Sequence, residues 1–302
     1  MIEILKPSIH YDWQSDIEPY LHTMQPVEGG YSLAKRGVIT LAQHTKVFVK
    51  IAEGDMTKKW VRKEILAYQT LNKAKFPFIP QLLSYDDTHS AMAIEYLENV
   101  SFDNIWDKDK LNAILNAQTE LKKYKHLFTN DPHFTLESVV GLDSKWPAIL
   151  RKGSLEKINN KFIELGVEAT LTRDQIELYE SMLVGWNIDN TTLVHQDIRA
   201  DNFGYDVSAK QGKLIDWNWL CIGDESLDLT PLFVNMYISG FDPYLFHPET
   251  YDAKMLAYLV SFWLERILES NHNENELAFK RSRAQATSVK AAVELLARTS
   301  TR

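Results

Sequence analysis

The stretch LVHQDIRADNFGYD, residues 193–206, sets a histidine, three aspartates, an arginine and an asparagine directly after an apolar pair. Asp197 and Asn202 lie five positions apart, and Asp216 ends the next β-type run, GKLID. A hairpin between these runs would bring Asn202 and Asp216 together as two oxygen ligands, the kind that Mg²⁺ prefers. Each acid alone could cap a turn. The combination instead predicts a magnesium and polyphosphate site, with Asp197 left to accept a proton or to orient an amine.

The pattern around this stretch predicts an α+β chain in two parts. Short runs rich in branched and aromatic residues dominate before residue 98, and one helix interrupts them. After residue 98 the spacing of apolar residues is mostly helical, apart from a β-type island at 193–217. The predicted strands are 37–42, 46–51 and 91–97, and the predicted helices are 57–74 and, approximately, 108–129, 172–186, 251–270 and 275–298. We therefore expect a small sheet lobe with one main helix over residues 1–97 and a larger, mostly helical lobe over residues 98–302.

Two charged residues in the first part occupy positions that local patterning does not require. Alternation in KVFVKI places Lys50 on a semi-apolar face, so its ammonium points either into a cleft or into solvent. Glu64 falls on the apolar stripe of the predicted helix, where burial of an unpaired carboxylate would be costly. We expect its partner to be Lys50, or else Lys59 or Lys63 on the same helix.

Composition excludes several classes of protein. The 302 residues, 45% hydrophobic and 25% charged, suit a globular protein that buries a large core. A net charge of −8 argues against nucleic-acid binding and is compatible with a cationic small molecule. Cys221 is the one cysteine, which excludes an internal disulfide and a multi-cysteine metal site. No signal peptide or membrane-spanning run is indicated, so we expect a cytoplasmic monomer or homodimer with no membrane partner.

LVHQDIRADNF followed by KLIDW resembles the catalytic motif and the metal-binding aspartate of the aminoglycoside phosphotransferase and choline kinase superfamily. These enzymes are small-molecule relatives of protein kinases. The shared pattern is H-x-D-x-x-x-x-N and then I-D-W, and weaker similarity extends from about residue 25 to about residue 235. The resemblance implies a bilobal, protein-kinase-like fold that binds ATP and Mg²⁺ between its lobes and phosphorylates a hydroxyl group. GTP in place of ATP stays open.

Carried over position by position, the resemblance implies the parts of a phosphoryl-transfer site. The implied roles are catalytic base for Asp197, magnesium ligands for Asn202 and Asp216, contact with the α- and β-phosphates for Lys50, anchoring of that lysine for Glu64, and mainly bracing of the loop for His195. Arg199 stands where protein kinases have a lysine that meets the transferred phosphate, and an arginine could grip that phosphate with two hydrogen bonds. Pairing of Arg199 with Asp201 or Asp206 is an equal alternative.

The resemblance also places the nucleotide. EGGYSLAKRGVITLA corresponds to a loop that covers the nucleotide between the first two strands. Gly29 and Gly30 would let the backbone approach phosphates and Ser32 could donate to one, although paired glycines also mark a plain turn. AIEYLEN resembles the segment whose backbone binds adenine, which sets Glu95 and Leu97 beside the base.

The acceptor is expected to be a small molecule. Asp228 follows Asp216 by twelve positions and no A-P-E sequence comes after it, which leaves no room for the segment on which protein kinases dock a peptide. Aromatic and acidic residues of the second part suit an amine or a quaternary ammonium, although most of the aromatics are expected to be core. They are Trp219, Tyr237, Tyr244, Trp263, Glu265 and Glu269. Asp228 itself is expected to cap or tie a loop.

Two kinds of function are therefore in view. The first is an active phosphotransferase whose acceptor is an aminoglycoside, choline, a sugar or another hydroxylated metabolite. The second is a catalytically silent nucleotide-binding protein with a regulatory role. Such proteins usually lack the base, the phosphate lysine or a metal ligand, and this sequence retains all of them. The sequence thus favours the phosphotransferase.

Overall fold

The computed structural model describes residues 10–27, 30, 33–138, 146–149, 154–247 and 252–299. The chain divides into two compact units, each of which is described by itself. Unit 1 comprises Met1–Asp103, Lys108–His133 and Ala200–Leu220, and unit 2 comprises Asn104–Asp107, Phe134–Arg199 and Cys221–Arg302. The lobe boundary expected between residues 97 and 98 stays a prediction.

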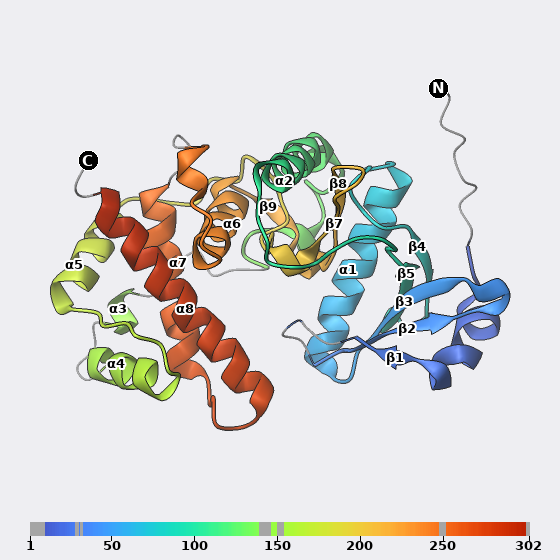
Figure 1. Ribbon diagram of the computed structural model, residues 1–302, viewed down its shortest axis with the longest axis horizontal. Coiled ribbons are helices and arrows are strands. Elements are labelled where there is room, and N and C mark those ends of the chain that lie inside the picture. Colours follow the sequence, from blue (N-terminus) through green and yellow to red (C-terminus); the bar gives the residue numbers. More distant parts are fainter. Residues whose placement is uncertain are drawn as a thin grey trace. The chain divides into compact units, whose positions relative to one another are not determined.

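Unit 1 is built around an antiparallel sheet with the strand order β1-β2-β3-β5-β4 (Figure 1). The strands are β1 (Gln25–Pro26), β2 (Lys35–Thr40), β3 (Lys46–Ile51), β4 (Leu82–Tyr85) and β5 (Ala91–Glu95). The three predicted strands are confirmed as β2, β3 and β5, with ends that differ by up to two residues. The sequence patterns did not predict β1 or β4. Strand β4 has three successive buried residues, so it lacks the alternation that marks a half-buried strand.

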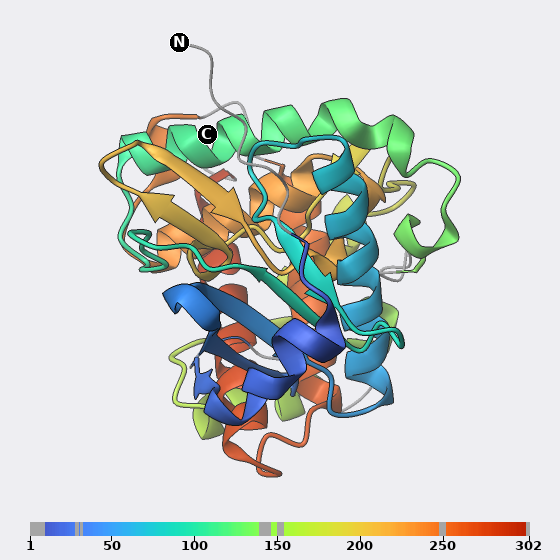
Figure 2. The same cartoon turned by 90° about the vertical axis from the view of Figure 1, so that its right-hand side faces the viewer.

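The two faces of this sheet pack against different parts of unit 1. Val47 and Val49 are fully buried on one face, in a cluster that includes Ile17 from the helical turns at 13–23. Lys50 lies on the opposite face, because successive residues of a strand point to opposite sides. Helix α1 (Asp55–Lys73) packs beside this sheet, as Figure 2 shows.

Helix α1 follows from the predicted apolar stripe. Its first turn is capped by Thr57, whose Oγ1 accepts the backbone N–H of Gly54 at 3.0 Å. The helix ends at Lys73, and the N–H of Phe76 then bonds to Leu71 O at 2.9 Å while Lys75 takes a left-handed φ of 60°. The buried positions of the stripe include a carboxylate and a phenol as well as apolar groups. These positions are Thr57, Val61, Glu64, Ile65, Ala67, Tyr68 and Leu71.

The remainder of unit 1 consists of a helix and a hairpin. Helix α2 (Lys108–Leu121) continues into a 3-10 helix (Lys122–Leu127), which confirms the helix predicted at about 108–129. Strands β7 (Phe203–Asp206) and β8 (Gln211–Leu214) form an antiparallel hairpin, the expected β-type island. The segment after β5 is bonded to this hairpin through a bridge between Ser101 and Tyr205, with both N–H···O distances at 2.9 Å.

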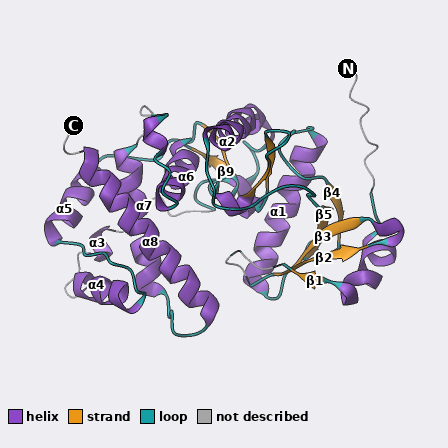
Figure 3. Ribbon diagram, in the orientation of Figure 1, coloured by secondary structure: helices purple, strands orange, loops and turns teal. Residues whose placement is uncertain are grey.

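Unit 2 is mostly helical (Figure 3). Its elements are α3 (Trp146–Ile149), α4 (Ser154–Glu164), α5 (Arg173–Met182), β6 (Thr192–Val194), β9 (Cys221–Gly223), α6 (Ser226–Ile238), α7 (Ala253–Glu269) and α8 (Glu276–Thr299). Helix α7 contacts each of the α-helices α3, α4, α5, α6 and α8, and β6 pairs with β9. The predicted helices at about 172–186, 251–270 and 275–298 are confirmed as α5, α7 and α8. In the described residues no helix is long and apolar enough to cross a membrane.

Candidate functional site

Three charged side chains from three elements meet inside unit 1. Lys50 Nζ on β3 lies 2.6 Å from Glu64 Oε2 on α1 and 2.6 Å from Asp216 Oδ1, which follows β8. Lys50 and Glu64 are buried, whereas 27% of the Asp216 side chain is exposed. The expected pairing of Glu64 with Lys50 is thus present. We call these three residues the ion triad, and Asp216 is the member that solvent reaches.

Burial and charge together set the protonation of the ion triad. Burial by itself would lower the pKa of Lys50, but the carboxylates of Asp216 and Glu64 outweigh it and raise this pKa above its ordinary value. The ammonium therefore stays charged. Burial raises the pKa of Glu64 from 4.5 to about 7, and the nearby Asp216 adds to this shift against the pull of Lys50. Glu64 consequently titrates near neutral pH in the folded protein.

The raised pKa of Glu64 gives stability a measurable pH dependence. The folded form holds this proton more tightly than the unfolded chain, so the stabilising effect is complete below about pH 4.5 and is lost as pH rises through about 7. Between pH 5 and pH 8 we expect the free energy of unfolding of the wild type to fall by about 2 kcal/mol more than that of Glu64→Gln. Urea unfolding of both proteins at the two pH values measures this difference. Parallel losses in the two proteins would contradict it.

Asp216 lies in a tight turn that fixes its carboxylate. Its backbone is left-handed (φ 66°, ψ 59°), a conformation that costs a non-glycine residue about 1–3 kcal/mol. With its amide nitrogen turned toward Asp216, Asn218 has that nitrogen 3.3 Å from Asp216 Oδ1 and 3.2 Å from Asp216 O, where it can donate to both. Trp217 donates its backbone N–H to Glu64 and its indole Nε1–H to Leu214 O at 3.0 Å. These contacts compensate for the strain and hold the carboxylate toward the lysine.

Asn202 lies at the same end of the β7–β8 hairpin as Asp216. The ladder pairs Phe203 with Leu214, and a further bond from Ile215 N to Asn202 O at 3.0 Å extends it by one position. An amide oxygen and a carboxylate suit Mg²⁺, which takes one or two protein ligands and completes its coordination with phosphate oxygens and water. In the part of the chain that the structure describes, no group of three or more His, Cys, Asp or Glu side chains could hold a metal ion. An amide oxygen and a carboxylate at one end of this hairpin fit a magnesium ion, and the assignment of Asn202 and Asp216 to it stays a prediction.

Of the residues predicted to cover a nucleotide, Gly30 is described, whereas Gly29 and Ser32 lie outside the described residues. Gly30 has a φ of 66°, which favours glycine, and a Cβ added there would lie 1.9 Å from Arg36 Nη1. The guanidinium thus packs directly on this glycine. Arg36 is the cross-strand neighbour of Lys50. Gly30 therefore lies beside the strand pair that carries the lysine of the ion triad.

The segment predicted to bind adenine packs against the β7–β8 hairpin. Glu95 Oε2 accepts from Lys213 Nζ at 2.6 Å and from Gln81 N at 3.1 Å. A Cβ added to Gly204 would lie 3.1 Å from Leu97 Cδ1, so this leucine contacts the hairpin. The carboxylate of Glu95 is committed to these protein contacts. Contact with a purine at this segment would fall to the backbone.

In unit 2, Asp228 ties the loop that carries His195 and Asp197. Asp228 is fully buried on α6 and accepts the backbone N–H groups of His195 at 3.2 Å and Gln196 at 2.6 Å. The expected tying role of Asp228 is thus present. Asp197 N donates to His195 Nδ1 at 3.3 Å, and Gln196 between them takes a left-handed φ of 66°. The part that His195 plays in catalysis stays a prediction.

Arg199 makes a contact that neither sequence interpretation named. Its Nε lies 2.9 Å from Asp197 Oδ1, and its Nη2 lies 3.2 Å from Asp197 Oδ2. The guanidinium thus lies beside both oxygens of the residue expected to act as the base and donates a hydrogen bond to one of them. Asp206, one of the alternative partners, caps its own turn by accepting the N–H groups of Ser208 and Ala209 at 2.8 and 3.0 Å. The contact keeps a positive charge beside Asp197.

Two of the aromatic residues considered for acceptor binding pack within unit 2. The hydroxyl of Tyr237 donates to Glu294 Oε2 at 3.1 Å, and the guanidinium of Arg298 lies 4.8 Å from the centre of the same ring. The ring of Tyr244 meets that of Phe233 edge to face at 5.4 Å. All four aromatic residues considered for the acceptor are nevertheless only partly buried, so the expectation that most of them are core is wrong; they are Trp219, Tyr237, Tyr244 and Trp263.

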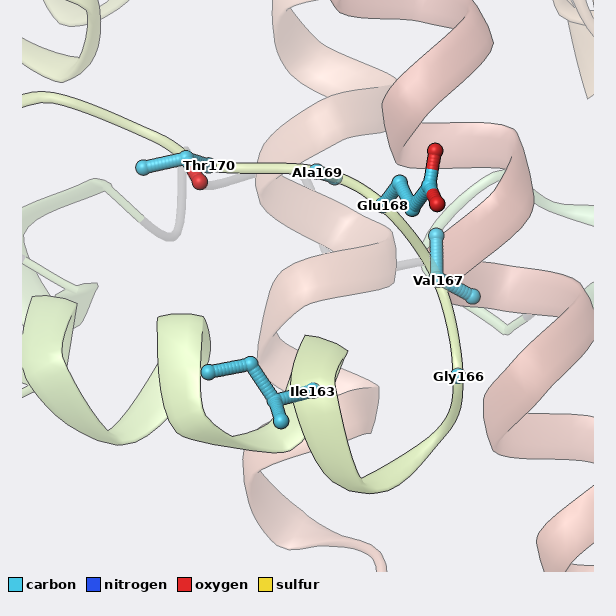
Figure 4. Close-up of a pocket in the computed structure, with 6 residues that line it drawn as sticks. All are labelled: Ile163, Gly166, Val167, Glu168, Ala169 and Thr170. Atoms are coloured by element: carbon cyan, nitrogen blue, oxygen red, sulfur yellow. The ribbon is translucent and has the colours of Figure 1, made fainter.

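Unit 2 also contains an open pocket of about 510 Å³ between α4 and the segment that follows it. Figure 4 shows Ile163 on α4 and the segment from Gly166 to Thr170, which turns back over the helix. The lining residues are Ile163, Gly166, Val167, Glu168, Ala169 and Thr170. None of the predicted site residues lines this pocket.

The sheet, the ion triad and the hairpin carry the residue types that a kinase-like phosphotransferase is expected to use. Residues 23–262 match the model of the phosphotransferase enzyme family. Because the match covers most of the chain, the protein belongs to this family of small-molecule kinases. A comparison with the curated proteins found no match.

Three solved structures illustrate the shared fold. Choline kinase LicA from Streptococcus pneumoniae is 14% identical, with 88% of this chain and 92% of that chain covered and a TM-score of 0.53. Macrolide 2'-phosphotransferase type I is 15% identical, with 87% and 90% covered and a TM-score of 0.53. The GDP and kanamycin complex of APH(2")-IIia is 13% identical, with 92% and 93% covered and a TM-score of 0.54. At these identities the likeness shows a common, kinase-like fold.

Proposed function

We propose that the protein transfers the γ-phosphate of ATP, with Mg²⁺, to a hydroxyl group of a small molecule that carries an amine or a sugar-like ring. GTP is the alternative donor. The observation that carries this proposal is the ion triad, in which the Lys50 ammonium lies 2.6 Å from a buried glutamate and 2.6 Å from a partly exposed aspartate. This is the charge pattern that kinases use to grip a metal-bound triphosphate. The choline, macrolide and kanamycin named for proteins of the same fold support a small acceptor.

The proposed reaction assigns one task to each residue. Asp197 accepts the proton of the acceptor hydroxyl while the oxygen of that hydroxyl attacks the γ-phosphorus. The bond between the γ-phosphorus and the oxygen that bridges it to the β-phosphate breaks. The products are a phosphate ester and ADP. Lys50 contacts the α- and β-phosphates and is anchored by Glu64. Asn202 and Asp216 would hold Mg²⁺, which supplies charge neutralisation on the phosphates when bound. Positioning of the reactants supplies much of the remaining acceleration.

A catalytically silent nucleotide-binding protein is the second candidate. The contact of Arg199 with both oxygens of Asp197 favours it, since a carboxylate held in this way is less available as a base. The two candidates differ in one respect. In the enzyme, a phosphate oxygen competes with Asp197 for the guanidinium and frees the carboxylate, whereas in the silent protein the pair persists.

A nucleotide-consumption screen separates the two candidates. Purified protein is incubated with ATP or GTP, with and without Mg²⁺, against a panel that contains gentamicin, kanamycin, a macrolide, choline and simple sugars. We expect Mg²⁺-dependent consumption with at least one acceptor, and a product heavier by one phosphoryl group in mass spectrometry. Nucleotide binding without consumption in any combination would favour the silent protein.

A further inference from the structure

Tyr68 carries a buried polar group that the ion triad does not explain. It lies on α1 four positions after Glu64, so the two side chains share one face of the helix. The side chain is fully buried, and no described residue hydrogen-bonds its hydroxyl. A phenylalanine would fill the same space without burying a hydroxyl. The hydroxyl of Tyr68 therefore needs a hydrogen-bond partner that explains why it is buried.

The surroundings of this hydroxyl are acidic. Burial raises the pKa of Tyr68 well above its ordinary value, and the carboxylates of Glu64, Asp216 and Glu95 raise it further. The phenol is thus neutral and able to donate a hydrogen bond. Buried polar groups almost always have a partner, either a protein group or an ordered water molecule. A partner at this position has to accept from the phenol and tolerate the neighbouring carboxylates.

We propose that the Tyr68 hydroxyl holds a buried water molecule that links it to a carboxylate of the ion triad. Water fits because it can accept a hydrogen bond from the phenol O–H and donate one to Glu64, which lies on the same face of the helix, at the same time. Tyr68 is then a positioning residue. With the water on one side and the Trp217 N–H on the other, Glu64 keeps one orientation and so keeps Lys50 in place. The effect on catalysis rests on the proposed function, whereas the water site does not.

Crystal structures of the wild type and of Tyr68→Phe test the water site without reference to activity. In the wild type we expect density about 2.7–3.0 Å from Tyr68 Oη and within hydrogen-bond distance of the Glu64 carboxylate. We expect that density to vanish in the variant, which keeps the ring and loses a single oxygen. Wild-type crystals without it, or variant crystals with it, would overturn the water site.

Steady-state kinetics test the positioning role. In Tyr68→Phe we expect the KM for Mg²⁺·ATP to rise roughly three- to tenfold, the scale of one lost water-mediated contact, with kcat changed less than about twofold. Tyr20→Phe is the matched control, because Tyr20 packs on the other face of the sheet in the same unit. Its KM is expected to equal that of the wild type. An unchanged KM in Tyr68→Phe would overturn the positioning role. If the wild type turns over no acceptor at all, the proposed function fails while the crystals still decide the water site.

Discussion

Asp197→Asn is expected to lower kcat by about 10²–10⁴-fold, the usual contribution of a positioned base. The affinity for Mg²⁺·ATP is expected to stay within about twofold, since the proposed nucleotide contacts come from other residues. The amide keeps the size of the side chain and can still accept from Arg199, but it cannot take a proton from the acceptor hydroxyl. Steady-state kinetics with an acceptor from the screen, together with calorimetric titration of Mg²⁺·ATP, measure both quantities.

Asp189→Asn is the matched control for this experiment. Asp189 is an exposed acid in the same unit, six positions before His195. Its replacement is expected to leave kcat and nucleotide affinity unchanged. Simultaneous loss of turnover and of nucleotide affinity in Asp197→Asn would show that Asp197 is structural. Full activity in that variant would place the base elsewhere.

Lys50→Met is expected to have the second large effect, on both activity and stability. It removes the cation from between Glu64 and Asp216, and breaking a buried ion pair in this way costs about 3–5 kcal/mol. Uptake of a proton by Glu64, whose pKa is already raised, offsets part of that cost. The kcat/KM for ATP is expected to fall by about 10²–10³-fold, because the contact with the phosphates is lost. Urea unfolding and steady-state kinetics measure the two effects.

Two further variants separate stability from function at this position. Lys46→Met alters an exposed lysine on the same strand, 3.7 Å from Glu98, and should change stability by less than about 0.5 kcal/mol. The double variant Lys50→Met, Glu64→Met replaces the buried pair by apolar side chains, which is often neutral for stability. We expect it to regain much of the lost stability and none of the lost activity. Recovery of activity would contradict the role of Lys50 at the phosphates.

Part of the ion triad could be predicted, because a charge at an apolar position needs a partner and Lys50 was one of the partners considered for Glu64; the contact of Lys50 with Asp216 was not predicted. Alternation placed Lys50 on the side of β3 away from the valine cluster, and the helical stripe placed Glu64 among buried residues. Both placements depend on the strand and helix periods alone. The hairpin between Asn202 and Asp216 could also be predicted from the sequence, because two short β-type runs flank a polar turn. Residue type and spacing therefore sufficed for these parts of unit 1, but not for strands β1 and β4.

Other contacts could not be predicted, since they depend on backbone conformation rather than on residue type. Several aspartates lie close to Arg199 in the sequence, and the conformation of the loop determines that it pairs with Asp197. The hydrogen bond from the Trp217 N–H to Glu64 lies next to Asp216, whose backbone is left-handed. Aspartate seldom adopts this conformation, so the sequence does not indicate it. Helix α6 was not predicted, because it is apolar on most sides and contains Pro231. Its sequence therefore lacks the alternation of apolar and polar residues that marks a surface helix.

The most direct test of the account is the Mg²⁺ dependence of nucleotide binding at the ion triad. ATP is titrated into the wild type and into Asp216→Asn, each with and without Mg²⁺. We expect the wild type to bind ATP at least about tenfold more tightly with Mg²⁺ than without, and Asp216→Asn to lose that gain, because the ion would be held by the Asp216 carboxylate. Equal affinity in all four titrations, or no binding in any of them, would contradict the account.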